Sequence, residues 1–96
     1  MNANIQFSVP VNIFRENDVF IADSPVLDLS TSAVTFELVQ KRFEEAIQLF
    51  FEELVEAGTV DEELSRLGWH KQDNNWAPPI LIETSNKVVN VPVHAT

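Results

Sequence analysis

The sequence predicts an α+β fold: an antiparallel three-stranded meander, then a long helix, a short helix and C-terminal β segments. Three observations support this. Apolar and polar residues alternate before residue 31, apolar residues recur every three or four positions between 35 and 58, and turn-rich β-like sequence follows residue 69. Because no repeat or linker interrupts these patterns, we expect residues 1–96 to form a single domain, with 69–96 as a β-like C-terminal extension.

Three segments near the start are predicted to form the meander. Strict alternation from Ile5 to Ile13 indicates a half-buried strand. A polar turn at residues 15–18 leads to a second, antiparallel strand at Val19–Ala22. A Ser-Pro pair breaks that strand, and we expect the third at Val26–Ser30.

The long helix is predicted between Thr35 and Gly58. Thr35 is a suitable N-cap, and Gly58 can adopt the left-handed conformation that ends helices. About six turns would be roughly 30 Å long, enough to cross one small sheet. The apolar residues that share the predicted core face are Phe36, Val39, Phe43, Ala46, Ile47, Phe50 and Leu54.

The region after the long helix is predicted to hold one short helix and β structure. Thr59-Val60-Asp61-Glu62 matches a capping box, so a short helix should run from there to Leu67 and end at Gly68. Trp69 to Trp76 encloses turn residues and predicts a small hairpin. Residues 80–82 and 88–93 have strand character, with a turn between them.

Composition limits the function classes. The formal net charge is −9, which argues against direct binding to nucleic acid or to an anionic membrane. The charge suits a basic protein partner, but from charge alone a role in solubility is the simpler interpretation. The absence of cysteine excludes disulfides, cysteine zinc sites and thiol nucleophiles. No signal peptide or membrane span is evident, so we expect a cytoplasmic protein.

Several short sequence stretches follow one another in a recognisable order. They are the run from Asp18 to Thr31, Thr35-Phe36-Glu37, Phe43-Glu44-Glu45-Ala46, Leu49-Phe50-Phe51-Glu52-Glu53, Glu56-Ala57-Gly58-Thr59 and Leu64-Ser65-Arg66-Leu67-Gly68-Trp69. Together these stretches resemble the HicB family of type II toxin–antitoxin antitoxins, over residues 5–69. The resemblance implies a partial RNase H-like fold with a three-stranded antiparallel meander, a helix and a further strand.

The resemblance also implies a function. HicB antitoxins bind and inhibit HicA, a small RNA-cleaving toxin with a catalytic histidine, and many carry a C-terminal helical segment that binds DNA. In this chain, residues 70–96 are proline-interrupted and β-like, and Lys71 and Lys87 are their basic residues. We therefore expect no separate DNA-binding domain and no direct binding to nucleic acid. An alternative is an orphan HicB-like oligomeric binding module that has no toxin.

A metal-dependent nuclease is the remaining alternative, because the implied fold is RNase H-like. That chemistry needs carboxylates converging on metal ions, one of them on the first strand, but residues 5–14 contain no acidic residue. Asp23 and Asp28 lie at predicted strand ends, while His70 and His94 lack neighbours that would form a triad or a metal site. We therefore expect no enzyme activity, no cofactor and no metal site.

Five apolar residues are candidates for contacts with a partner or a second subunit. Leu38 and Leu49 fall on the helix face opposite the predicted core stripe. In the tail, Val89, Val91 and Val93 could form an edge strand added to another subunit. We expect a homo-oligomer, most simply a dimer. We expect the acidic residues between 44 and 63 to form a solvated face. As a docking surface for a basic toxin, they would mainly raise the association rate.

Overall fold

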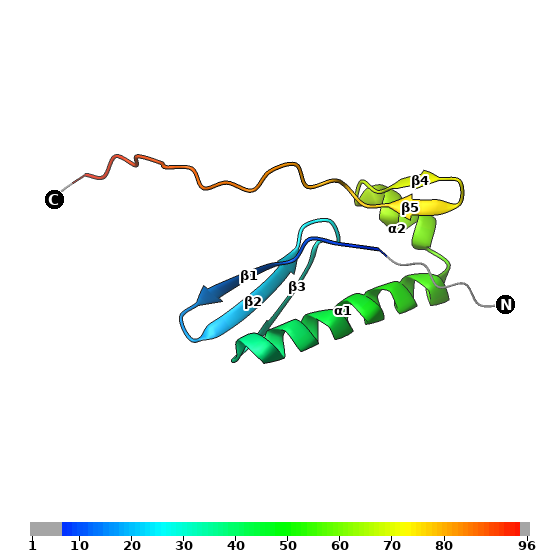
Figure 1. Cartoon of the computed structure of the whole chain (residues 1–96), viewed down its shortest axis with the longest axis horizontal. Helices are drawn as coiled ribbons and strands as arrows, with labels where there is room; N and C mark the ends of the chain where they lie inside the picture. Colours follow the sequence, from blue (N-terminus) through cyan, green and yellow to red (C-terminus); the bar gives the residue numbers. More distant parts are fainter. Residues whose placement is uncertain (1–6, 95–96) are drawn as a thin grey trace.

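The computed structural model describes residues 7–94 and has an α+β architecture (Figure 1). One layer is a three-stranded antiparallel sheet of order β1-β2-β3, and the other is a long helix that crosses it. A short helix and a two-stranded sheet follow. The bounds are β1 Asn12–Glu16, β2 Val19–Ser24, β3 Leu29–Ala33, α1 Phe36–Ala57, α2 Val60–Arg66, β4 His70–Gln72 and β5 Asn75–Ala77.

The meander is confirmed, but the first strand starts later than the alternation predicts. β1 pairs with β2 from Asn12 to Glu16. Residues 7–11 form no strand, because β2 ends at Ser24, one residue beyond the Asp23 that pairs with Asn12, and leaves them without a partner strand. Phe7 and Val9 still pack into the core, so the alternation marks a real apolar face. The predicted residues 5 and 6 lie outside the described part of the chain.

The third strand is also displaced, from the predicted 26–30 to Leu29–Ala33. Val26 and Leu27 belong to the turn after β2, in which the Leu27 N–H donates to the Ser24 carbonyl over 3.3 Å. Asp28 then adopts a left-handed conformation with φ of 51°. Val26 and Leu27, whose apolar side chains suggested a strand, are instead buried as part of this turn.

The predicted ends of α1 are confirmed. The Thr35 Oγ1 accepts a hydrogen bond of 3.0 Å from the Leu38 N–H. Gly58 has φ of 71°, and its N–H donates to the carbonyls of Leu54 and Val55. Both caps satisfy backbone groups that have no partner inside the helix.

Phe36 and Leu38, at the start of α1, do not lie on the predicted faces. Val39 and Phe43 are buried as expected, whereas Phe36 is 46% exposed. Leu38, predicted to face away from the core, is half-buried and packs against it. The reason is that β3 runs beside this flank of α1, where the Arg42 guanidinium donates to the Ser32 carbonyl over 3.1 Å.

The capping box predicted for α2 is wrong, although the helix itself forms. The Thr59 side chain makes no capping hydrogen bond. Its N–H already donates to the Leu54 carbonyl of α1 over 3.0 Å, so it is not free for the Glu62 side chain. The chain therefore turns directly from one helix into the next.

The hairpin predicted between Trp69 and Trp76 is confirmed as β4 and β5. Asp73 and Asn74 form its turn with φ of 50° and 69°, the conformation that a two-residue hairpin turn requires. Pro78 and Pro79 follow and are half-buried.

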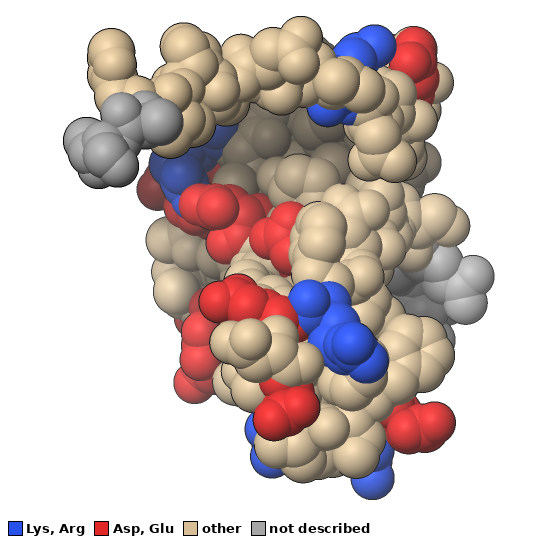
Figure 2. Space-filling view, turned by 90° about the vertical axis from the view of Figure 1, so that its left-hand side faces the viewer, with Lys and Arg blue, Asp and Glu red and all other residues tan. Residues whose placement is uncertain are grey.

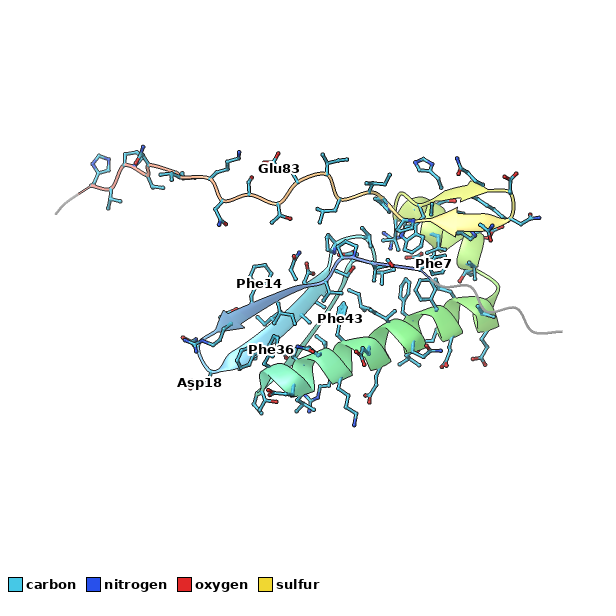
Figure 3. The ribbon with its side chains drawn as sticks, viewed as in Figure 1. Phe7, Phe14, Asp18, Phe36, Phe43 and Glu83 are labelled. Atoms are coloured by element: carbon cyan, nitrogen blue, oxygen red, sulfur yellow. The ribbon has the colours of Figure 1, made fainter. Side chains whose placement is uncertain are left out.

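The core consists of two clusters of buried residues. The sheet cluster contains Ala22, Ala33, Val39 and Phe43, and it lies between the sheet and α1 (Figure 3). The Trp69 cluster contains Val26, Leu27, Leu64 and Trp69, and it joins the β2–β3 turn to α2. The half-buried side chains of Leu29 and Ile47 pack against both clusters.

Residues 80–94, which we call the arm, leave the hairpin as an extended segment that runs past the sheet (Figure 1). The strands predicted at 80–82 and 88–93 do not form, because no strand in the described part of the chain pairs with the arm. The radius of gyration is 17.3 Å, whereas a compact domain of this length has about 12–13 Å. In the described part of the chain, no helix is both long and apolar enough to cross a membrane.

Candidate functional site

The surfaces of α1 and α2 carry a group of acidic residues. All are exposed except the half-buried Glu63, and they are Glu44, Glu45, Glu52, Glu53, Glu56, Asp61, Glu62 and Glu63. Figure 2, which looks at the end of the molecule where the β1–β2 turn and the start of α1 lie, shows acidic side chains on that end as well. Acidic groups at this density give the surface a negative potential.

Two acidic residues of α2 have basic partners. Glu63 accepts a hydrogen bond of 3.0 Å from the Arg66 Nε. This hydrogen bond is the main reason why the pKa of Glu63 lies below its ordinary value and that of Arg66 above its own. The Lys71 ammonium lies 3.4 Å from an Asp61 carboxylate oxygen. The acidic residues of α1 form no ion pair within residues 7–94, so their charge faces solvent.

The five residues predicted as contact sites fall into two groups. Leu49 is 55% exposed on α1, while Leu38 contributes to the core. Val89, Val91 and Val93 lie on the arm and are 71–84% exposed. The structure does not bring the helix and arm residues together into one surface.

The edge of the sheet formed by β1 is open. Within the described residues β1 pairs with β2 alone, so its other side presents backbone N–H and C=O groups that have no partner strand there. β3 is the other edge strand, but α1 packs beside it and Arg42 occupies the Ser32 carbonyl. The open edge was not predicted. The sequence offered a signal for it, since the N-terminal alternation has only one partner strand in the meander.

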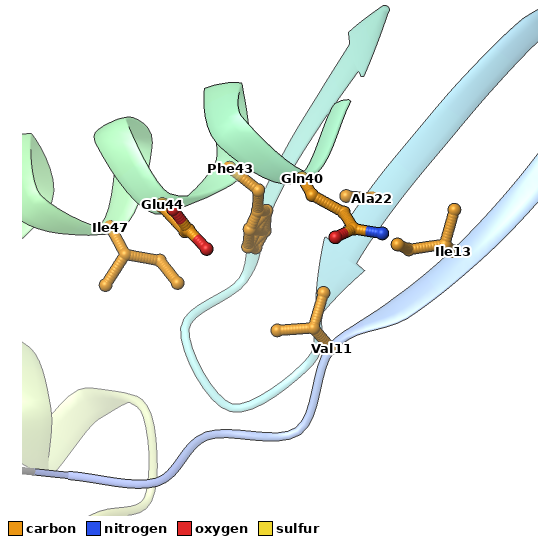
Figure 4. A pocket seen from close by; sticks show the side chains of 7 residues that line it. All are labelled: Val11, Ile13, Ala22, Gln40, Phe43, Glu44 and Ile47. Carbon is orange, nitrogen blue, oxygen red and sulfur yellow. The ribbon is translucent and has the colours of Figure 1, made fainter. Parts of the chain in front are cut away.

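A small cavity of about 200 Å³ lies beside β1, between this strand and α1 (Figure 4). Val11 and Ile13 line it from the side of β1, and Phe43 and Ile47 line it from α1. Gln40 and Glu44 provide its polar groups. The lining is therefore mostly apolar, which suits packing against apolar side chains.

A second, larger cavity of about 420 Å³ lies on the other side of Ile47. Its lining is mainly apolar and consists of Phe7, Val9, Ile47, Gln48, Phe51, Val55, Val60, Leu64 and Trp76. It contains no titratable side chain. Phe51 and Phe7 pack here in the Trp69 cluster, a contact that the predicted helix face did not include.

The candidates for metal chemistry do not form a cluster. Asp23 is half-buried in β2, and Asp28 is exposed in the turn that follows. Among residues 7–94, no group of three histidine or acidic side chains could hold a metal ion. His70 and His94 are exposed, the first in β4 and the second in the arm.

Comparison with known proteins adds no family to these observations. No family model matches the chain, and neither a curated protein nor a solved structure is similar to it.

Proposed function

We propose that this chain is a HicB-like antitoxin, which binds and neutralises a small basic RNA-cleaving toxin similar to HicA. The proposal rests on the contact between two of the sequence stretches that carry the resemblance, residues 18–31 and residues 64–69. Val26 and Leu27 come from one stretch and Leu64 and Trp69 from another, and all four form the Trp69 cluster. The Trp69 indole N–H donates to the Val26 carbonyl over 2.8 Å. Order and spacing in the sequence therefore correspond to one packed unit.

The element order also supports the proposal. An antiparallel three-stranded meander followed by a long helix is what the resemblance implies for the first two-thirds of the fold. The partial RNase H-like assignment belongs to the same proposal. The further strand of that fold would come from residues after α2, which here form β4, β5 and the arm.

The charge of α1 supports a basic partner. Glu45, Glu52 and Glu56 are exposed, and no basic side chain within the described residues forms an ion pair with them. Acidic groups on a docking surface raise the association rate of a basic protein more than they raise affinity, and salt screens this effect.

The proposal is tested with the small basic protein encoded by the adjacent reading frame. We expect the chain to co-purify with that protein and to suppress its RNA cleavage when the two are mixed. Full cleavage activity in the presence of excess chain would contradict the antitoxin function. An adjacent frame without such a protein favours the alternative, an orphan HicB-like binding module.

A charge-reversal variant tests whether the acidic residues of α1 guide association with the toxin. E45K/E52K/E56K should lower the association rate constant at least about tenfold at low salt, with a smaller effect at high salt. The variant E16K/D18K/D73K changes the formal charge by the same amount at exposed positions outside α1 and α2. Equal effects of the two variants would show that net charge, rather than this surface, guides association.

A further inference from the structure

The arm and the open edge of β1 have complementary properties. Seven large apolar residues of the arm are 60–93% exposed, and they are Ile80, Leu81, Ile82, Val88, Val89, Val91 and Val93. The arm is extended but pairs with no strand among residues 7–94 of its own chain. β1 has free backbone groups along one side, and the apolar cavity lies beside it. The edge of β1 lacks a neighbouring strand, and the arm is an extended apolar segment that could provide one.

We propose that the arm of a second copy of this chain adds to β1 as a fourth strand, and that the two copies exchange arms reciprocally. The pairing segment is residues 88–93, which is similar in length to β1. Alternate side chains of a strand point to the same face, so Val89, Val91 and Val93 would lie together on one face of the extended sheet. There they would cover the cavity beside Val11 and Ile13. Pro92 lacks an N–H, which an outermost strand tolerates.

The direction of the arm favours a second copy over the arm's own chain. In Figure 1 the arm and β1 run in the same direction. Addition within one chain would create a parallel pair at an exposed edge, and parallel pairs are the less stable kind and are usually buried on both faces. A copy related by a two-fold axis perpendicular to β1 offers its arm in the opposite direction, so the pair becomes antiparallel.

The start of the arm is held away from its own sheet. Pro79 packs close to Gly68, with its Cγ 3.7 Å from the position that a Cβ on this glycine would occupy. Two consecutive prolines also keep the segment stiff and extended. Figure 2 shows the arm across the top of the molecule, standing clear of the body below it. This geometry leaves the arm accessible to another copy.

The arm itself brings no net charge to the contact. The arm contains Glu83 and Lys87, so its formal charge is zero while the whole chain has −9. The two acidic bodies of the dimer still repel each other, but at physiological salt this repulsion is screened beyond about 8 Å, and the uncharged arm adds nothing to it.

The first experiment is the mass of the full chain by size-exclusion chromatography with light scattering at tens of micromolar. We expect twice the 10.9 kDa of one chain. V89D/V91D should reduce the mass to that of one chain, because it places two charges against an apolar cavity. The matched control N86D/N90D adds the same charge to the same arm at polar positions and should remain dimeric. A single-chain mass for the unchanged protein, or a dimer that tolerates V89D/V91D, would overturn the proposal.

The second experiment determines whether β1 binds the arm of its own chain or the arm of a second copy. The chain has no cysteine, so N12C in one chain and N90C in a second, longer tagged chain provide two unique thiols. We expect a short bis-maleimide to link the two chains when they are mixed. N90C mixed with E53C, on the outer face of α1, should give no link. Linkage within an N12C/N90C chain, without linkage between the mixed chains, would assign the arm to its own sheet and overturn the exchange. Neither experiment contains a toxin, so the results do not depend on the proposed function.

Discussion

The two core clusters are built in different ways. In the sheet cluster, Ala22, Ala33, Val39 and Phe43 come from neighbouring elements within one short stretch of sequence. Phe43 is its one large buried side chain. In the Trp69 cluster, a turn, two helices and the start of the hairpin meet, and the residues come from positions 26 to 69. The first cluster is local, and the second joins distant parts of the chain.

Aromatic contacts and one side-chain hydrogen bond further distinguish the Trp69 cluster from the sheet cluster. The Phe7 ring lies edge-on to Trp69 with 5.1 Å between centroids and stacks on Phe51 at 5.6 Å. The indole N–H of Trp69 is bonded to the Val26 carbonyl, 43 residues earlier. The sheet cluster has no such directional bond between its members. The fold therefore depends on packing at the sheet and on one anchored indole at the other end.

The largest loss of stability is expected from Trp69→Ala. It removes a large buried side chain and leaves the Val26 carbonyl without its donor. We expect a cost of about 4–5 kcal/mol, a large part of the stability of a domain this size. Urea unfolding at one fixed protein concentration measures it. Trp76→Ala is the matched control, because Trp76 is half-buried, and it should cost about 1–2 kcal/mol. Equal costs would show that Trp69 does not anchor its cluster.

Phe43→Ala should cost slightly less, about 3–4 kcal/mol, because it empties the centre of the sheet cluster without breaking a hydrogen bond. Glu45→Ala, two residues along the helix on its exposed face, should cost under about 0.5 kcal/mol. The same urea titration compares them. Similar values would mean that α1 is rotated relative to the sheet.

The difference between the clusters explains how much of the fold the sequence could predict. Helical periodicity and caps gave the bounds of α1 and the burial of Val39 and Phe43, because those signals lie within the helix itself. Strand bounds shifted because pairing, not alternation, determines where a strand begins. Leu38 was misplaced because β3 covers one flank of α1, which no helix pattern records.

The interaction surfaces were predictable in part. Exposed acidic residues and the apolar arm follow from composition and alternation. The open edge of β1 and the cavity beside it depend on how the sheet and α1 are placed in three dimensions. The hydrogen bond from Trp69 to Val26 has no local signal, since the two residues are far apart in sequence and one belongs to a turn.

Trp69→Phe separates the hydrogen bond from the packing. It retains an aromatic ring but removes the N–H, so we expect a cost of about 1–2 kcal/mol, well below that of the alanine variant. In the unchanged protein, the indole N–H of Trp69 should exchange with solvent more slowly than that of Trp76, which NMR can follow separately. Fast exchange at Trp69 would contradict the buried bond.

The smallest effect is expected at Ser24, which ends β2 next to the turn that carries Val26 and Leu27. The side chain is fully buried, and its hydroxyl has no hydrogen-bond partner within residues 7–94. An unpaired buried hydroxyl carries a desolvation cost, so Ser24→Ala should leave stability unchanged or raise it by up to about 1 kcal/mol. Ser30→Ala, at an exposed position of β3, is the control for the loss of a serine from the same sheet. If Ser24→Ala instead lowered stability by more than about 1 kcal/mol while Ser30→Ala did not, the hydroxyl would have to be bonded to a buried water. The junction between the two clusters would then be polar, and its hydrogen bond would link them.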